Sequence, residues 1–305
     1  RTSWPANPRQ PIATRRSAEL GAHCPTGAAE ASDGERGTRD ERLPSMAANR
    51  KAGKQRVNAE PARPVAGLES QGLSGKIPGV SIARLIDHTL LKPDARPEQV
   101  EQLWAEAVEW KFASVCVNSG YVPLCRRRVE GSGVKVCTVI GFPLGAMLRE
   151  AKAAEVAAAV NLGADELDMV MNVGWFKAGA DELVVSDIHR VLDAAQQRSV
   201  KVIIETCLLT DEEKERATRL VVESGAAFVK TSTGFSTGGA TLGDVLLLAR
   251  VAAGRIGVKA AGGIRDYSTA LKMIEAGATR IGTSSGVEIV NEERNQGLKE
   301  PRSQG

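Results

Sequence analysis

Short apolar runs alternate with helical patterns at a regular pitch along most of the chain, beginning near residue 80. Each run is almost entirely apolar, which is typical of a parallel sheet that is covered on its outer side. The eight runs lie at residues 84–91, 112–118, 134–142, 166–174, 200–209, 226–233, 255–263 and 279–286.

The segments between these runs carry helix signals, namely apolar residues at helical spacing or recognisable ends. After the fifth run, Thr210 and Glu213 form the spacing of a capping box. Eight strand–helix units predict a closed (β/α)8 TIM barrel over residues 76–290. An open doubly wound sheet is disfavoured, because no GxGxxG follows the first strand. The other helical segments are residues 97–110, 150–163, 181–197 and 266–277.

The two ends of the chain lack this pattern. Residues 1–75 are rich in Pro, Gly, Ser, Arg and Ala, which predicts a disordered low-complexity extension before the barrel. They contain no apolar core of a secretory signal, and their acidic residues disfavour a transit peptide. Because the chain starts with Arg, Met46 is a candidate translation start. Residues 291–305 are predicted to form a polar C-terminal tail.

Composition excludes several classes of function. The net charge of +3 has its basic surplus in the first 75 residues, so the barrel region shows no nucleic-acid footprint. No apolar run reaches transmembrane length. Five cysteines without a CxxC motif indicate free thiols in a reducing compartment, and three histidines show no metal-ligand spacing. We therefore expect a cytoplasmic protein with no metal, no nucleic-acid partner and no membrane contact.

Polar side chains interrupt the apolar runs, mostly where strands are expected to end. In a barrel of this kind, the C-terminal ends of the strands form the active site. Any one of these polar side chains could be a buried group whose hydrogen bonds are satisfied. Charged residues that recur on strand after strand, however, are costly in a dry interior. The residues are Asp87, His88, Asn118, Thr138, Asp168, Asn172, Glu205, Thr206, Lys230, Thr231, Thr233, Lys259, Ser284 and Ser285.

Lys230 and Lys259 occupy equivalent places on consecutive predicted strands. Neighbouring strands lie about 4.8 Å apart, so both amines can point into one cavity. Repulsion between two ammonium groups about 4 Å apart is roughly 4 kcal/mol at an effective dielectric of 20, which predicts a lowered pKa for one of them. A neutral lysine attacks carbonyl carbons. Spacing leaves open which lysine is the nucleophile, and also whether both simply pair with Asp168, Asp87 or Glu205.

A neutral lysine that attacks an aldehyde forms a carbinolamine and then an imine. The protonated imine accepts electrons, so that the neighbouring C–C bond can be broken or formed. Such chemistry requires a proton shuttle, and Asp168, in an otherwise apolar run, is the best placed carboxylate.

Glycines and hydroxyl residues gather at the ends of the last three predicted strands. Barrels of this kind often bind a substrate phosphate between the loops after strands seven and eight, near the start of a short helix. Glycines allow backbone N–H groups to approach phosphate oxygens, and serines add hydroxyl donors. Residues 287–293 could form that helix. The predicted phosphate-binding residues are Thr233, Gly234, Gly262, Gly263, Arg265, Gly282, Ser284 and Ser285.

The motifs on all eight predicted strands resemble those of the bacterial-type deoxyribose-phosphate aldolases. The resemblance covers roughly residues 80–290 and is most specific in FVKTSTGF (228–235), VKAAGG (258–263) and GADELDMV (163–170). It implies a class I aldolase that needs no metal or cofactor. Such an enzyme reversibly cleaves 2-deoxy-D-ribose 5-phosphate into acetaldehyde and D-glyceraldehyde 3-phosphate, in deoxyribose phosphate catabolism.

The resemblance also assigns roles to single residues. The lysine of FVKTSTGF, Lys230, forms the Schiff base, and the lysine of VKAAGG, Lys259, is the neighbouring proton donor or acceptor. Asp168 is the proton-relay carboxylate, while Asp87 and Cys116 match positions that line the pocket. A small phosphorylated sugar is the expected partner, and a homodimer is one assembly that the sequence leaves open.

This chain departs from some family members at two positions. Phe235 follows KTSTG where some members have a lysine that aids phosphate binding. Some members also have a C-terminal tyrosine that assists proton transfer. This sequence has no tyrosine at its end, so that assistance is absent or replaced by water. The alternatives to the aldolase are another sugar-phosphate lyase or isomerase on the same barrel, and a barrel that binds a sugar phosphate without catalysis.

Overall fold

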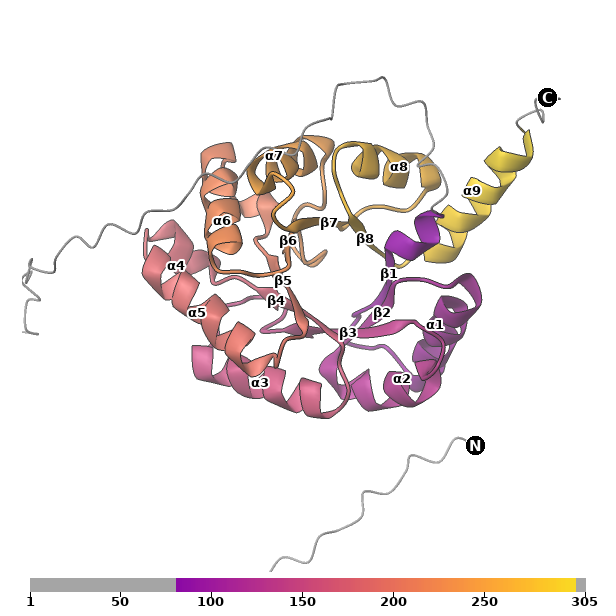
Figure 1. Cartoon of the computed structure of the whole chain (residues 1–305), viewed down its shortest axis with the longest axis horizontal. Helices are drawn as coiled ribbons and strands as arrows, with labels where there is room; N and C mark the ends of the chain where they lie inside the picture. The colour runs from indigo at the N-terminus through magenta and orange to yellow at the C-terminus, as the bar shows by residue number, and fades with distance from the viewer. Residues whose placement is uncertain (1–80, 300–305) are drawn as a thin grey trace, which may run out of the picture. The chain divides into compact units, whose positions relative to one another are not determined.

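In the computed structural model, residues 81–299 are described. Within this range, eight parallel strands close into a barrel in sequence order, from β1 to β8 and back to β1, and helices surround it (Figure 1). The predicted TIM barrel is thus confirmed. The predicted extension over residues 1–75 lies outside the described residues.

The strands are shorter than the apolar runs that predicted them. Each run continues past its strand into the loop at the C-terminal end, where apolar and functional residues follow one another. The strands are β1 (Ile86–Leu90), β2 (Ser114–Val117), β3 (Lys135–Ile140), β4 (Glu166–Val170), β5 (Ser199–Ile203), β6 (Phe228–Lys230), β7 (Gly257–Ala261) and β8 (Arg280–Thr283).

Because the strands are shorter than the predicted runs, several polar residues lie at other places in the barrel than expected. Asp87 and His88 lie within β1, before its C-terminal end, and successive strand residues face opposite sides of the sheet. Glu205 and Thr206, expected on the fifth strand, lie beyond it at the short 3-10 helix η3 (Thr206–Leu208). Thr233 likewise follows β6 instead of lying on it.

The helices largely follow the predicted signals. Helix α1 (Pro97–Trp110) has the predicted bounds, with Pro at its first position. Helix α6 (Asp211–Glu223) begins with the predicted capping box, in which the Thr210 hydroxyl accepts from the Glu213 amide. The other elements are α2 (Val122–Val129), α3 (Arg149–Asn161), α4 (Val173–Lys177), α5 (Asp181–Ala194), α7 (Leu242–Ala252), α8 (Tyr267–Glu275), η1 (Ile82–Leu85) and η2 (Ser119–Tyr121).

The last helix, α9 (Gly286–Lys299), runs past residue 290, where the barrel was expected to end in a polar tail. Its Glu293 accepts hydrogen bonds from the hydroxyl of Ser81 (3.0 Å) and from the amide of Ile82 (3.1 Å), before the first strand. Residues 291–299 therefore belong to the helical layer, because their polar groups hold the start of the barrel.

One large apolar layer stabilises the fold. It lies between the strands and the surrounding helices, and it forms a continuous core from Ile82 to Val290. None of the described helices is long and apolar enough to cross a membrane. The barrel interior differs from this core, because it holds charged side chains.

Candidate active site

A cluster of charged side chains fills the interior of the barrel. Six of them are buried and the Arg280 side chain is 12% exposed, although burying an isolated charge costs several kcal/mol. The strands account for the juxtaposition, since inward-facing residues of parallel strands converge on the barrel axis. The members of this charged cluster are Asp87, Glu166, Asp168, Lys201, Lys230, Lys259 and Arg280.

Asp168, on β4, lies at the centre of the charged cluster. Its Oδ2 accepts hydrogen bonds from the Nζ atoms of Lys230 (2.8 Å) and Lys259 (2.7 Å), and its Oδ1 accepts from Lys201 Nζ (2.7 Å). Burial raises the pKa of Asp168, but these three ammonium groups lower it well below its usual value. The carboxylate therefore stays charged.

Lys259, on β7, is held by two carboxylates. Its Nζ donates to Asp87 Oδ2 (2.5 Å) as well as to Asp168. Burial lowers the pKa of Lys259, but Asp168 and Asp87 together raise it above its usual value. Lys259 is therefore a firmly protonated ammonium in this structure.

The predicted repulsion between Lys230 and Lys259 needs correction. The two lysines are paired residues on β6 and β7, as expected, but both ammonium groups donate to one oxygen of Asp168. The opposite charge between them offsets the repulsion that the sequence argument considered alone. The alternative, in which the two lysines pair with carboxylates, describes their contacts with Asp168 and Asp87 better than direct repulsion does. Glu205 forms no ion pair within the described part of the chain.

Lys201, on β5, is a member of the cluster that sequence reasoning missed. It is fully buried and lies 2.7 Å from both Asp168 and Glu166, because Asp168 and Lys201 are paired residues of neighbouring strands. Burial lowers the pKa of Lys201, but Asp168 and the neighbouring acids raise it well above its usual value. Its signal was a single lysine between the valines of an apolar run.

Arg280, on β8, and Glu166, on β4, complete the cluster. The guanidinium contacts Asp87 (2.7 Å) and Glu166 (3.0 Å), which joins the last strand to the first and fourth. Lys135 also reaches Glu166 (2.9 Å), with a side chain that is 54% exposed. Neither Arg280 nor Glu166 was singled out from the sequence, because both stand at the beginning of their strands.

Counting charges identifies one lysine as exceptional. The cluster has four cations and three carboxylates, so it holds one cation in excess. Lys201, Lys259 and Arg280 each contact at least two carboxylates. Asp168 is the one carboxylate that Lys230 contacts within the described part of the chain. It is the least compensated cation of the charged cluster.

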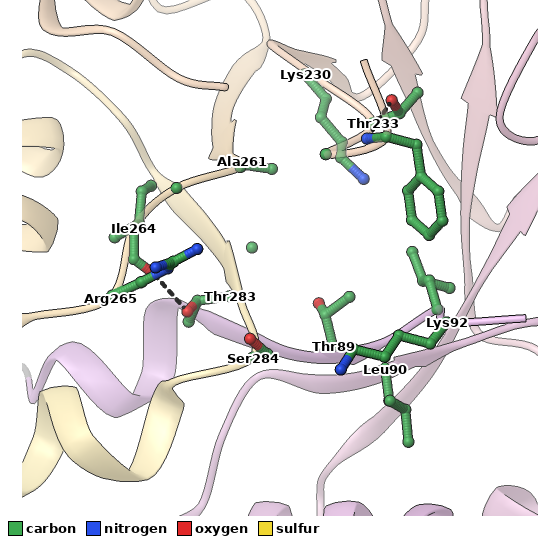
Figure 2. Close-up of a pocket in the computed structure, with 16 residues that line it drawn as sticks. Thr89, Leu90, Lys92, Lys230, Thr233, Ala261, Ile264, Arg265, Thr283 and Ser284 are labelled. Carbon is green, nitrogen blue, oxygen red and sulfur yellow. Dashed lines mark hydrogen bonds between the residues drawn. The ribbon is translucent and has the colours of Figure 1, made fainter. Parts of the chain in front are cut away.

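Lys230 is also the cluster member that reaches open space. It lines a pocket of about 440 Å³ at the C-terminal end of the barrel, whereas the other cluster members lie outside the lining (Figure 2). The pocket lining consists of Thr89, Leu90, Leu91, Lys92, Lys230, Thr233, Gly234, Phe235, Ala261, Gly262, Gly263, Ile264, Arg265, Gly282, Thr283 and Ser284.

Most residues predicted to bind phosphate line this same pocket. They come from the loops after β6 and β7, from β8 itself (Gly282) and from the loop that follows it. Ser285 is the exception, and its amide donates to the Thr283 hydroxyl (2.9 Å). The predicted residues that line the pocket are Thr233, Gly234, Gly262, Gly263, Arg265, Gly282 and Ser284.

Glycines bring two of these loops together. A Cβ on Gly239 would lie only 2.3 Å from the backbone oxygen of Gly262, so this approach requires glycine. The amide of Ala240 donates to that oxygen (3.0 Å). Gly234 and Gly263 have positive φ angles of 82° each and open space where a Cβ would project.

Glu205 holds the loop after β6. Its carboxylate accepts from the hydroxyl (2.5 Å) and the amide (3.2 Å) of Thr233, and the Thr233 hydroxyl accepts from the Phe235 amide (3.0 Å). Glu205 itself has a positive φ of 55°, which is uncommon for a non-glycine residue. The loop that follows Lys230 is thus fixed by a buried carboxylate.

Asp87 and Cys116 lie beneath the pocket rather than in its lining. Both are fully buried, and Asp87 acts on the site through Lys259. Cys116 pairs with Cys137 across β2 and β3. A hydrogen bond with Cys137 lowers the pKa of Cys116, against the raising effect of burial.

Two groups of three buried acidic or cysteine side chains have metal-ligand spacing within the described residues. They are Cys116, Cys137 and Asp168, and Asp87, Cys137 and Glu166. The Lys201 ammonium contacts members of both, at 3.3 Å from Cys137 and 2.7 Å from Asp168 and Glu166. A protein cation therefore already compensates these donors, which disfavours a metal there.

Comparisons with known proteins agree with this geometry. The family described as DeoC/LacD family aldolase matches residues 81–292. A deoxyribose-phosphate aldolase from Streptococcus uberis is 56% identical, covering 72% of this chain and 99% of that protein. A Geobacillus enzyme of the same name is 58% identical, covering 69% and 95%. The structure of a putative deoxyribose-phosphate aldolase from Coccidioides immitis has a TM-score of 0.69 at 43% identity, covering 70% and 86%.

Proposed function

This chain belongs to the DeoC/LacD family of aldolases, and we propose that it reversibly cleaves 2-deoxy-D-ribose 5-phosphate with Lys230 as Schiff-base residue. The observation that carries the assignment of Lys230 is its position. It is the one member of the charged cluster that lines the pocket, and it is the least compensated cation there. Loss of one proton from Lys230 leaves the cluster electrically balanced.

The first half of the reaction forms the imine. The lone pair of neutral Lys230 attacks C1 of the open-chain aldehyde, the carbonyl oxygen takes up a proton from Lys259, and the nitrogen releases one to Asp168. That second proton passes to the carbinolamine hydroxyl, which leaves as water while the nitrogen lone pair forms the C=N bond of the protonated imine. Lys230, Asp168 and Lys259 are joined by hydrogen bonds of 2.8 and 2.7 Å, which provide this route.

The second half breaks the C2–C3 bond. The C3 hydroxyl loses its proton, its C–O bond becomes the carbonyl of D-glyceraldehyde 3-phosphate, and the C2–C3 electron pair moves into an enamine. Protonation of the enamine at C2 and hydrolysis of the imine release acetaldehyde and restore the amine. The firmly protonated Lys259 and the ionised Asp168 suit this exchange, since one stores a proton and the other accepts one.

The pocket also suits the phosphate of this substrate. Its lining contains Arg265, and the glycines at 234, 262 and 263 have positive φ angles. Such loops can turn backbone N–H groups toward an anion. The other candidates are a different sugar-phosphate lyase or isomerase and a barrel that only binds its ligand. They would share these phosphate-binding loops but would produce no acetaldehyde.

Borohydride trapping tests the proposal. Incubation with acetaldehyde and borohydride should add a two-carbon fragment to Lys230, and mass spectrometry of the peptide locates it. Lys230→Ala should give no such adduct and no acetaldehyde from 2-deoxy-D-ribose 5-phosphate. A wild-type protein left unmodified, or one labelled on Lys259, would contradict the assignment.

Asp168→Asn tests the proton relay in the same assay. Turnover should fall by roughly 10²–10⁴-fold, the range for loss of a general acid–base group. Because Asp168 accepts from three ammonium groups, circular dichroism must confirm that the variant is folded. A folded variant with wild-type turnover would exclude Asp168 from the relay.

The homodimer and the cytoplasmic location stay predictions. The aldolase from Aeropyrum pernix, 36% identical with a TM-score of 0.66 and covering 70% of this chain and 92% of that one, is described as a tetramer. Barrels of this family can thus associate, and sedimentation analysis of this chain measures its own assembly. A role in deoxyribose phosphate catabolism follows from the proposed substrate.

A further inference from the structure

We propose that Lys92 supplies a second positive charge for the substrate phosphate, together with Arg265. This inference rests on the proposed function, which provides the phosphorylated substrate. Lys92 lies between β1 and α1 and lines the same pocket as Lys230. Figure 2 shows Lys92, Lys230 and Arg265 approaching the pocket from different sides.

The backbone of Lys92 is held in place by its neighbours. Lys92 precedes Pro93, which restricts the conformation of the preceding residue, and its carbonyl accepts from the Ala95 amide (3.1 Å) in a turn. The side chain of Asn118 donates to the carbonyl of Leu91 (3.1 Å), directly before Lys92. The side chain therefore begins from a fixed point at the rim of the pocket.

The charge of Lys92 has no protein counter-ion in the described residues. Among residues 81–299, no carboxylate lies within 4.0 Å of the Nζ of Lys92 or of the guanidinium nitrogens of Arg265. The pocket lining contains three cations and no acidic side chain. A pocket of this composition favours an anionic ligand.

The charge of the ligand explains why one arginine is insufficient. A phosphate monoester carries a charge of about −1.5 to −2 near pH 7. Lys230 is engaged by Asp168 and must be neutral to attack the carbonyl, so it cannot serve as the counter-ion. Phe235 supplies no charge at the place where some family members have lysine. Lys92 and Arg265 together match the dianion.

The test compares Lys92→Gln, which removes the charge, with Lys92→Arg, which keeps it. With 2-deoxy-D-ribose 5-phosphate, Lys92→Gln should raise KM roughly fivefold, as expected for an exposed charge-assisted contact, with kcat nearly unchanged. With 2-deoxy-D-ribose, which lacks phosphate, kcat/KM should not change. Lys92→Arg should restore the KM. Lys272→Gln, an exposed lysine on α8, is the matched control and should behave as wild type.

Binding of inorganic phosphate decides the inference independently of turnover. In calorimetric titrations at constant ionic strength, Lys92→Gln should bind phosphate about fivefold more weakly than wild type and Lys272→Gln. Equal phosphate affinity in wild type and Lys92→Gln, or an equal loss with both sugars, would overturn the role of Lys92. Absence of acetaldehyde from the wild-type protein would instead reject the proposed function, while the titration still judges Lys92.

Discussion

Single residues of this protein act through the charges that surround them. Lys230 and Lys259 have the same residue type and adjacent strand positions, yet Lys259 contacts two carboxylates and Lys230 contacts one. Lys230 also faces the pocket. The difference in surroundings, rather than direct repulsion between the two, distinguishes the proposed nucleophile from the proposed proton store.

His88 provides a pH dependence at the residue scale. It is buried on β1, where it contacts Glu106 (2.7 Å). Burial lowers the pKa of His88 below its usual value of 6.5, although Glu106 and Glu288 act in the opposite direction. Between the folded and unfolded pKa values, the unfolded state binds more protons. The free energy of unfolding should therefore fall as pH decreases from 7.5 to 5.5.

Urea denaturation at pH 7.5 and 5.5 measures this effect. In His88→Gln, which cannot titrate, the difference between the two pH values should shrink. His189→Gln, an exposed histidine on α5, should keep the wild-type difference. The lowered pKa values of Asp87, Glu166 and Asp168 act as pH falls through the unfolded values of 3.8 and 4.5, so they contribute little between pH 7.5 and 5.5. An unchanged pH difference in His88→Gln would refute the assignment.

At the scale of elements, the active site depends on how the loops after β6 and β7 meet. Glu205 fixes the start of the first loop, and the contact between Gly239 and Gly262 joins its end to the second. Lys230 and the predicted phosphate-binding residues are therefore held by two loops that contact each other. A change at the contact between the loops should disturb binding more than chemistry.

Gly239→Ala tests this contact. The new methyl group would collide with backbone, which cannot move as a flexible side chain can. We expect a loss of about 1–3 kcal/mol in the free energy of unfolding. The KM for the phosphorylated substrate should rise about tenfold or more, because small displacements in a binding site are costly.

Gly243→Ala is the matched control, since Gly243 lies in the first turn of α7 and the nearest atom to its Cβ would be the Thr241 hydroxyl oxygen, at 4.0 Å. It should be neutral or stabilise the helix by up to about 1 kcal/mol. Steady-state kinetics and urea denaturation of both variants give the comparison. Gly239→Ala with wild-type stability and KM would show that the loops tolerate separation.

At the scale of the whole molecule, the closed barrel joins the start of the described chain to its end. β1 pairs with β8, and Arg280 of β8 contacts Asp87 of β1. Outside the barrel, α9 lies against η1 and carries Glu293, which accepts from Ser81 and Ile82. Closure is thus supported by both the strands and the outer helices.

Truncation measures how much α9 contributes. Removal of residues 291–305 deletes the hydrogen bonds that Glu293 accepts. It also deletes the hydrogen bond from the Tyr267 amide to Glu292 (2.8 Å) and the contact of the Arg294 guanidinium with the Trp110 ring, 4.2 Å from its centroid. At about 1 kcal/mol for each lost hydrogen bond or cation–π contact, the protein should lose about 2–4 kcal/mol of stability. Removal of residues 300–305 keeps α9 whole and should leave stability unchanged. Equal stability of the two truncated proteins would show that residues 291–299 are dispensable.

The sequence by itself determined the barrel and the motifs. Apolar runs, helix spacing and the capping box at Thr210 and Glu213 are local patterns, and each depends on residues a few positions apart. They predicted eight strands and most helices correctly. They also drew attention to Lys230, Lys259 and Asp168, whose catalytic roles stay predictions until the variants are measured.

Only the tertiary structure decided which charges meet. Lys201 lies against Asp168 because β4 and β5 pair in one register, and Lys259 contacts Asp87 across 172 residues of chain. A local pattern cannot specify such pairs, since strand register and barrel closure depend on the whole fold. The same reason explains why residues 291–299 of α9 were expected to form a tail: their polar groups have partners only after the barrel has closed.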